Sequence, residues 1–410
     1  MGRVTAVPSA TLTVVGIDAD GRPPHPVALA ALAGARLVVG AARHLAAVPL
    51  PAGATTLTLG PLAPALDALA AAVAAGRPAA VLASGDPGLF GIVRRLREAG
   101  LSPRVLPAVS SVAAAFARAG LPWDGAAVVT AHGRDLRPAL NACRALPAVA
   151  VLTAPGAGAT ELGAGLLGWE RCLVVAEHLG TEDERITTVT PAEAAAGSWA
   201  DPHVLLSLTG SGARGGMRAD NQPAAAPAGG WALPETAYAH RDSMITKSEV
   251  RALAVARLRP RLGRLVWDVG AGSGSVGVEC ALLGAAVVAV DHDPGATDLV
   301  RANAARHGVH VRVVPGRAPD VLADLPDPDA VFVGGGGTDV LAAVAARRPG
   351  RVVATLAALD RVAPAVGLLR GAGYAVDGVQ LSAARLADLP GGSIRLAATN
   401  PVVVLTGELP

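Results

Sequence analysis

The sequence predicts an α/β protein with two domains, the second of which is a doubly wound sheet. Strand and helix patterns alternate along most of the chain, which is typical of helices covering the faces of a sheet. A glycine turn directly follows the apolar strand predicted at 265–269. Between 209 and 230 the composition changes to Gly, Ser, Ala, Pro and Asn without periodicity, which predicts a flexible linker. We therefore divide the 410 residues into domains 1–208 and 231–410.

The first domain is predicted to contain two α/β lobes. Its first half alternates strands with apolar helices. The strands are expected at 12–17, 35–40, 79–83, 104–106 and 126–130, and the helices at 27–33, 62–75, 90–99 and 111–120. The second half repeats the mixture with more scattered polar residues, and its strands are expected at 149–152, 172–176 and 204–208.

The second domain is predicted to form one doubly wound sheet. It opens with a helix over 247–258, capped by Ser248 or Thr246. Strands are expected at 265–269, 287–291, 311–314, 330–333 and 351–356, and further helices at 298–306 and 340–347. Segments 376–381 and 400–405 are expected to pair antiparallel at the end.

Composition excludes several classes of protein. Hydrophobic residues make up 51% of the chain and charged residues 17%, which is ample for packed cores. The net charge of +2 is too small to indicate a nucleic-acid-binding protein. No apolar run is long enough to span a membrane, and the start lacks a signal peptide. The three cysteines have neither CxxC spacing nor a histidine cluster, so we expect reduced thiols, no metal and a cytoplasmic location.

The glycine turn of the second domain predicts a nucleoside-containing ligand. Asp268 is followed by Gly270, Gly272 and Gly274, a spacing that lacks the third glycine of a dinucleotide fingerprint. The next predicted strand ends in Asp291, about twenty residues beyond the turn, where a carboxylate can accept both ribose hydroxyls. An ordinary strand-to-helix turn would explain the glycines alone. Together with the two aspartates, they resemble the S-adenosylmethionine site of class I methyltransferases.

Three loops of the first domain follow predicted strands and are expected to converge on a site. The first carries Gly85, Asp86 and Pro87, whose glycine opens the turn, aspartate anchors it and proline stiffens it. The second offers the hydroxyls and amides of Ser110 and Ser111 at a helix start. The third contains the run A-H-G-R, with His132 and Arg134.

These loops resemble the tetrapyrrole methylases of corrin and sirohaem synthesis. The resemblance is carried by S-G-D-P-G-L-F-G, P-A-V-S-S-V, L-P-W-D, A-H-G-R and E-H-L-G-T-E-D-E-R-I. It implies a two-lobed domain that binds S-adenosylmethionine between its lobes. One departure concerns the first loop, where the family's V-G-x-G-P-G is replaced by a segment containing Asp18.

The fusion of two such domains is similar to the precorrin-6Y C(5,15)-methyltransferase (decarboxylating) family of cobalamin biosynthesis. In the second half the resemblance rests on M-I-T-K-S-E-V-R, P-G-R-A-P, P-D-A-V-F-V-G-G-G and the N-P near the end. Thr355 is a departure, because relatives commonly have asparagine there. The resemblance implies conversion of precorrin-6B to precorrin-8: methylation of carbon 5 by the first domain, methylation of carbon 15 by the second, and loss of the ring C acetate as carbon dioxide.

Ligands and partners follow from the same resemblance. It implies one S-adenosylmethionine per domain, with Gly316 and Ala318 near the adenine, a precorrin substrate and a homo-oligomer. A substrate with many acid side chains needs cationic partners. Our candidates for this role are His132, Arg134, Lys247 and Arg251, each of which could equally be a surface charge. Glu279 is expected to brace the glycine turn.

Two other functions are compatible with these patterns. The chain could be a methyltransferase for another substrate, such as RNA or a small acid, that uses only its second domain. It could also be a sensor that binds a tetrapyrrole or S-adenosylmethionine without turnover, an interpretation supported only by the altered loop at Asp18. A turnover assay distinguishes these possibilities.

Overall fold

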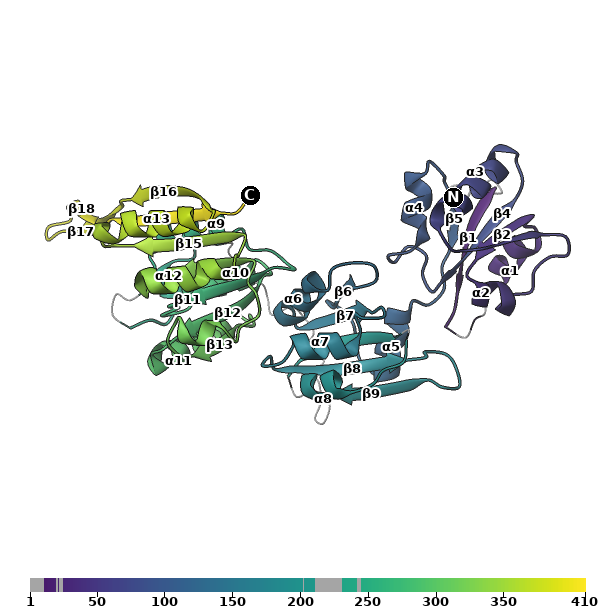
Figure 1. The fold of residues 1–410 in the computed structure, drawn as a ribbon, viewed down its shortest axis with the longest axis horizontal. Helices are drawn as coiled ribbons and strands as arrows, with labels where there is room; N and C mark the ends of the chain where they lie inside the picture. The colour runs from purple at the N-terminus through teal and green to yellow at the C-terminus, as the bar shows by residue number, and fades with distance from the viewer. Residues whose placement is uncertain (1–10, 20, 22–24, 202, 211–230, 242–244) are drawn as a thin grey trace.

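In the part of the chain that it describes, the computed structural model contains three large sheets and one two-stranded sheet, arranged along the chain (Figure 1). It describes residues 11–410 except 20, 22–24, 202, 211–230 and 242–244. The linker expected at 209–230 therefore lies almost wholly outside the described residues. Two five-stranded sheets precede it, and a seven-stranded sheet with a separate two-stranded hairpin follows it. The predicted α/β class, with two lobes followed by a doubly wound sheet, is confirmed.

The first lobe is built on a parallel sheet in the order β3-β2-β4-β1-β5. Its strands are β1 (Leu12–Ile17), β2 (Leu37–Gly40), β3 (Thr55–Thr58), β4 (Ala79–Ser84) and β5 (Arg104–Leu106). Its helices are α1 (Pro26–Ala33), α2 (Ala42–Ala47), α3 (Leu62–Ala74) and α4 (Ile92–Glu98). The sequence analysis missed β3, whose residues are largely exposed, and the six-residue α2.

The second lobe is a mixed sheet in the order β6-β7-β10-β8-β9, in which only β6 and β7 are parallel. Its strands are β6 (Ala127–Thr130), β7 (Ala148–Leu152), β8 (Arg171–Glu177), β9 (Arg185–Val189) and β10 (His203–Thr209). Its helices are α5 (Ser111–Ala119), α6 (Arg137–Ala145), α7 (Ala159–Gly165) and α8 (Pro191–Ala196). Helix α5 crosses from the first lobe, because Val112, Ala115 and Phe116 are buried against this second sheet.

The last sheet has the order β13-β12-β11-β14-β15-β19-β16, with β19 antiparallel to both neighbours. Its strands are β11 (Leu265–Val269), β12 (Ala286–Asp291), β13 (Arg312–Pro315), β14 (Ala330–Val333), β15 (Arg351–Leu356), β16 (Ala375–Leu381) and β19 (Val402–Glu408). The antiparallel pair expected at the end of the chain is confirmed. Strands β17 (Ala384–Asp388) and β18 (Ile394–Ala398) form a separate hairpin that the sequence analysis missed.

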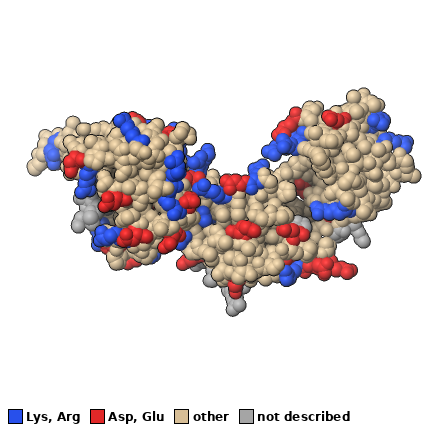
Figure 2. Space-filling model, viewed as in Figure 1, with Lys and Arg blue, Asp and Glu red and all other residues tan. Residues whose placement is uncertain are grey.

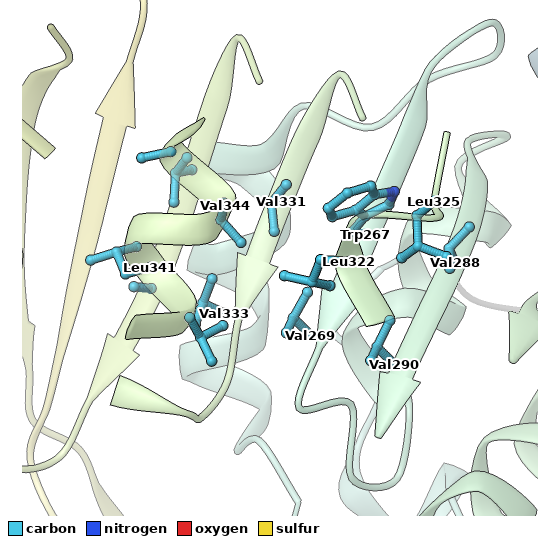
Figure 3. Packing of buried hydrophobic residues seen from close by; sticks show 14 of the residues in the cluster. Trp267, Val269, Val288, Val290, Leu322, Leu325, Val331, Val333, Leu341 and Val344 are labelled. Carbon is cyan, nitrogen blue, oxygen red and sulfur yellow. The ribbon is translucent and has the colours of Figure 1, made fainter. Parts of the chain in front are cut away.

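Helices cover both faces of this last sheet (Figure 1). They are η1 (Glu235–Ala237), α9 (Ser248–Leu258), α10 (Ser275–Leu282), α11 (Pro294–Arg306), η2 (Asp320–Leu322), α12 (Gly337–Ala346), η3 (Leu359–Arg361) and α13 (Val362–Gly371). Helix α9 begins after Lys247, whose side chain makes no capping hydrogen bond, so the expected cap at Ser248 or Thr246 is wrong. On one face, fully buried Trp267 packs among Val288, Leu322 and Leu325 (Figure 3).

The second lobe packs against the amino ends of the strands of the last sheet. Trp169 shares a core cluster with Leu265 and Trp267. The side-chain amide of Asn141, on α6, donates to the carbonyl of Gly263 at 3.1 Å, just before β11. Arg137, also on α6, donates to the carbonyl of Asp327, just before β14, at 3.1 Å. The contact therefore combines a buried aromatic ring with directed hydrogen bonds.

The described residues include no helix long and apolar enough to cross a membrane. Cys143, Cys172 and Cys280 are buried and unpaired, as expected. Acidic and basic side chains are interspersed on the face drawn in Figure 2, without a broad field of one sign.

Candidate functional site

A cavity of about 930 Å³ lies between the two lobes of the first domain. The first lobe lines it with the loops that follow β1, β4 and β5, which meet at one edge because these strands are parallel. The second lobe contributes Thr153, His178 and His203, which lie at the ends of β7, β8 and β10. The cavity is therefore assembled from loops far apart in the sequence.

The three loops of the first lobe hold one another tightly. The carboxylate of Asp18, after β1, accepts a hydrogen bond from the backbone amide of Val109 at 3.0 Å. Gly85, which has a φ of +57°, donates its amide to the carbonyl of Ile17 at 2.7 Å. A Cβ atom at Gly16 would lie 2.3 Å from the Gly85 carbonyl oxygen, so only glycine fits there. Asp18, the departure noted in the sequence, thus joins two loops of the cavity.

Most of the predicted residues on these loops line the cavity. Those that do are Gly85, Asp86, Ser110 and Ser111, whereas Pro87 is not among the lining residues. Asp86 anchors its turn by accepting the amide of Gly88 at 2.8 Å. Ser110 caps α5 by accepting the amide of Ala113 at 3.1 Å. Their binding of a ligand remains a prediction.

His132 and Arg134 lie on the loop after β6, with exposed side chains outside the residues that line the cavity. The amide of His132 donates to the Thr130 hydroxyl at 3.2 Å. The guanidinium of Arg134 lies 5.9 Å from the centroid of the Phe90 ring, which belongs to the loop after β4. This cation–π contact joins the two lobes. Direct binding of substrate by either side chain remains a prediction.

Two cavity residues on α2 escaped the sequence analysis. Arg43 donates to the hydroxyl of Ser84 at 3.1 Å, and the same hydroxyl lies 3.1 Å from Nε2 of His44. Burial, together with the neighbouring Arg43 charge, lowers the pKa of His44. Nδ1 of His44 is buried without a partner among the described residues. The only sequence signal was the pair itself, in a helix too short to show periodicity.

The glycine turn of the second domain lies where the strand order reverses, between β11 and β14. The Gly272 amide donates to the carboxylate of Asp291 at 2.9 Å, which joins the turn to the end of β12. A Cβ at Gly270 would lie 3.1 Å from the Gly335 nitrogen, so the loops after β11 and β14 touch through backbone. Space above Gly272 is open, because a Cβ there would meet no atom within 4 Å. A ligand can therefore approach the turn closely.

Asp268 lies near the carboxyl end of β11, two residues before Gly270 of this turn. Its carboxylate is buried, and Oδ2 accepts the amide of Gly277 at 2.8 Å, which fixes the start of α10. Burial is the main cause that raises the pKa of Asp268 to about 7; the hydrogen bond from Gly277 opposes the shift and the charge of Asp291 adds to it. One carboxylate oxygen of Asp268 thus positions the start of α10, and the role of Asp268 in binding a cofactor remains a prediction.

Asp291, Gly316 and Ala318 meet at the same edge of the sheet. The amide of Gly316 donates to the carbonyl of Asp291 at 2.9 Å, and Ala318 is partly buried nearby against the core. One carboxylate oxygen of Asp291 accepts from Gly272 and the other from the amide of Asp293. Each oxygen retains a lone pair for a ribose hydroxyl. Their roles toward a nucleoside remain predictions.

A second cavity, of about 400 Å³, opens beside the glycine turn, over the carboxyl ends of β14 and β15. Gly334, Gly335 and Thr355 line it, together with Arg361 of η3. Arg361 is a cation that the sequence analysis missed, because nothing in its local sequence sets it apart from other surface arginines.

The structure corrects the assignment of Arg251 to substrate binding. Its side chain is fully buried, and its Nε donates to Glu279 at 2.6 Å. The remaining guanidinium nitrogens donate to the carbonyls of Thr246 and Leu233. No part of Arg251 is left to meet a substrate carboxylate.

Glu279 braces the segment before α9 and not the glycine turn. Its carboxylate accepts the amides of Ala232 and Leu233, each at 3.0 Å, and the hydroxyl of Tyr238 at 3.2 Å. The helix pattern revealed neither this burial nor that of Arg251, because a charge on a helix is normally solvated.

Lys247 is half-buried at the amino end of α9. Its helix is held to the hairpin by Arg385, which pairs with Glu235 and Glu249 at 2.7 and 2.6 Å. The residues that line the second cavity do not include Lys247. Its contact with substrate remains a prediction.

The geometry fits two small-molecule sites of the methyltransferase kind. One is a cavity between lobes whose loops present backbone amides and hydroxyls, and the other is an open glycine turn with a carboxylate at the end of the next strand. Residues 26–195 match the family described as Tetrapyrrole (Corrin/Porphyrin) Methylases. Residues 236–404 match the Precorrin methyltransferase domain. The fold and the sites therefore define a fusion of two methyltransferase domains.

Comparison with whole proteins narrows this class. The chain is 37% identical over 381 residues to a precorrin-6Y C(5,15)-methyltransferase [decarboxylating] of Sinorhizobium sp, covering 87% of this chain and 86% of that protein. It is 39% identical to a probable cobalt-precorrin-6B C(15)-methyltransferase (decarboxylating) of Pyrobaculum calidifontis, covering 42% of this chain and 94% of that protein. A crystal structure of precorrin-6Y C5,15-methyltransferase from Geobacter metallireducens is 32% identical, with a TM-score of 0.41, and covers 43% of this chain and 97% of that one. This chain belongs to the precorrin-6Y C(5,15)-methyltransferase (decarboxylating) family.

The Arg251–Glu279 pair makes a testable prediction about stability. Replacing Arg251 by Met leaves the Glu279 carboxylate buried without its counter-charge, and we expect a loss of about 3–5 kcal/mol in the free energy of unfolding. The double variant Arg251→Met/Glu279→Gln should regain part of this loss. Denaturant unfolding measures both, with Lys247→Met as the control. An Arg251→Met protein of unchanged stability but with a raised KM for substrate would instead support the original prediction that Arg251 binds substrate.

Proposed function

We propose that this chain methylates a precorrin at carbons 5 and 15 and removes the ring C acetate as carbon dioxide, converting precorrin-6B to precorrin-8 in cobalamin biosynthesis. The observation that carries the proposal is the presence of both sites on one chain that matches a bifunctional relative along 87% of its length. Membership of this methyltransferase family implies the use of S-adenosylmethionine.

We assign carbon 5 to the first domain and carbon 15 with decarboxylation to the second. The support is that relatives named C(15)-methyltransferase (decarboxylating) match only 42% of this chain, a length that fits the second domain alone, and the match covers 94% of their own length. The domain limits that accompany this assignment are 1–208 and 231–410, with a linker between them, and each domain would hold its own S-adenosylmethionine. A cytoplasmic location, in keeping with three unpaired cysteines, remains a prediction.

The residues of both sites suit a reaction that depends on positioning. S-adenosylmethionine supplies an electrophilic methyl group, and the bridging carbons of a reduced tetrapyrrole are electron-rich, so no strong base is required. In the first domain, the joined loops around Asp18 and Gly85 would hold the cofactor against the cavity. In the second, the Gly272 turn and Asp291 would hold it at the edge of the sheet. Alignment of the reacting atoms then supplies much of the rate.

Two arginines are our candidates for holding the acid side chains of the substrate. Arg43 lines the first cavity and is kept in place by Ser84. Arg361 lines the second. A guanidinium can bind a carboxylate with two parallel hydrogen bonds, which fixes orientation as well as affinity.

The second cavity also suits decarboxylation. Much of its lining is apolar, including Val333, Leu341, Leu356 and Ala365. A carboxylate placed against such a surface loses hydration, whereas carbon dioxide does not need it. Loss of carbon dioxide leaves an electron pair that the conjugated macrocycle can absorb, so the protein has only to orient the leaving group.

The product of the reaction tests this proposal directly. Purified protein incubated with precorrin-6B and S-adenosylmethionine should yield a product that has gained two methyl groups and lost one carbon dioxide, measured by mass spectrometry. Gly335→Trp fills the second cavity from a position where an added Cβ meets no atom within 4 Å. We expect this variant to lose the carbon dioxide release and one of the methyl transfers. An unchanged substrate mass with the wild-type protein would favour a sensor or another acceptor.

The arginine assignments predict site-specific losses. Arg43→Ala should lower kcat/KM for the methylation at carbon 5 by roughly 10- to 100-fold, as expected for the loss of about 1.5–3 kcal/mol from a charged hydrogen bond. Arg361→Ala should do the same for carbon 15. Arg94→Ala and Arg370→Ala, on exposed helix surfaces, are the matched controls. Equal effects of all four variants on both methylations would contradict the assignments.

We also propose that the chain is a homo-oligomer that buries the β17–β18 hairpin. Leu386 and Leu396 are paired across the hairpin and are 71% and 67% exposed, and Ile394 on the same face is 62% exposed. A two-stranded hairpin with an apolar face is marginally stable in water without a partner. A second copy of the same hairpin supplies an apolar face of matching size.

This assembly is tested by measuring mass in solution. We expect the wild-type protein to sediment at a multiple of the mass of one chain, and Leu396→Glu to shift it toward a single chain. Leu283→Glu changes an exposed leucine directly after α10, outside the hairpin, and should have no such effect. A wild-type protein that is monomeric at all concentrations would refute the proposal.

A further inference from the structure

The contact between the methylase domain and the last sheet lies at the edge opposite to the cofactor turn. Asn141 binds the carbonyl of Gly263, and Arg137 binds the carbonyl of Asp327, both just before strands of that sheet. The glycine turn, Asp291 and the second cavity all follow the strands. Strands of about five residues separate the two edges by roughly 17 Å.

The positions of the other elements agree with this arrangement (Figure 1). The final strand β19 is antiparallel, so Glu408 pairs with Arg351 at the amino end of β15, and the chain terminus lies on the side that faces the second lobe. The β17–β18 hairpin follows Leu381 of β16. Leu381 pairs with Val402 of β19, next to Val403, which pairs with Leu356 at the carboxyl end of β15. The hairpin therefore lies on the far side of the domain (Figure 1). The second cavity is therefore on the side turned away from the methylase domain.

The second lobe likewise has its contact with the last sheet on one side and the cavity between the lobes on the other. Strand β8 begins at Arg171, two residues after Trp169, which packs into the core of the last sheet. The strand ends at Glu177, directly before His178, which lines the cavity between the lobes. Its seven residues span about 23 Å. The interdomain contact and the first cavity thus lie at opposite ends of the same strand.

We propose that the half-modified tetrapyrrole leaves one site of the chain and reaches the other through solvent, because the two sites face away from each other across the second lobe and the last sheet. This inference rests on the proposed function. The distance along these strands is on the order of 40 Å, and packed sheets fill it. Trp169 is only 8% exposed, and Asn141 and Arg137 donate hydrogen bonds across the same contact, so reorientation of the two domains would have to break a buried interface.

The chemistry of the two sites agrees with independent operation. Each has its own arginine, Arg43 or Arg361, and its own polar loops. A relative named C(15)-methyltransferase (decarboxylating) is covered to 94% of its length by a match over 42% of this chain, which fits the second domain alone and indicates that such a domain folds without a fused methylase domain.

Two full-length variants with opposite steric blocks test the proposal. Ser84→Trp fills the first cavity from an exposed position at the end of β4, and Gly335→Trp fills the second. The two proteins are purified separately, mixed at equal concentration and given precorrin-6B with S-adenosylmethionine. Mass spectrometry of the solution after filtration detects the once-methylated intermediate and the twice-methylated product. Thermal unfolding shows that each variant is folded.

We expect neither variant alone to make the twice-methylated product and the mixture to make it within about twofold of the wild-type rate, with free intermediate in the filtrate. If the intermediate instead passed directly between the two sites of one chain, its effective concentration at the second site would be of order mM. The mixture of the two variants, at μM enzyme, would then make the product at least about tenfold more slowly than the wild type. That result, with no free intermediate, would overturn the inference. Failure of the wild-type protein itself to make the product would refute the proposed function instead.

Discussion

The carboxylate of Asp329 is the contact on which the arrangement of the chain depends. It accepts a hydrogen bond at 2.7 Å from the amide of Leu265, which is the first residue of β11. It also lies 3.4 Å from the side-chain amide of Asn141 and 3.4 Å from the guanidinium of Arg137, both on α6. The same group thus aligns the start of the central strand and anchors the second lobe to it. Because the second lobe is held at the amino ends of the strands, the opposite edge is left open for ligands.

Two kinds of charged group follow from this architecture. Asp268, Arg251 and Glu279 are buried, and they position the backbone of the turn and of the segment before α9. Arg43 and Arg361 line cavities and can meet a substrate. Residues of the first kind affect a reaction through the shape and stability of the fold, whereas those of the second can contact the reacting molecule. The distinction depends on burial, which residue type alone does not reveal.

Much of the fold was predictable because its signals are local. Buried strands such as 265–269 and 286–291 are largely apolar runs, and the glycines between them indicate a tight turn. Several of the missed elements lacked such signals. β3 and the β17–β18 hairpin are mostly exposed, and α2 has only six residues. Two of the three predicted loops of the first domain, those after β4 and β5, were found at one cavity because they follow parallel strands of one sheet. The third, with His132 and Arg134, follows β6 of the second lobe and does not line that cavity.

The sequence by itself determined the class of each domain, the glycine turn with Asp291, and the family, because these depend on residues close together in the chain. Tertiary structure alone decided which charges meet solvent and which edges of the sheets meet each other. Arg251 is enclosed by Leu233 and Glu279, and Asn141 finds its partner at Gly263, more than a hundred residues away. Such contacts form only when separate elements pack, so no local pattern contains them.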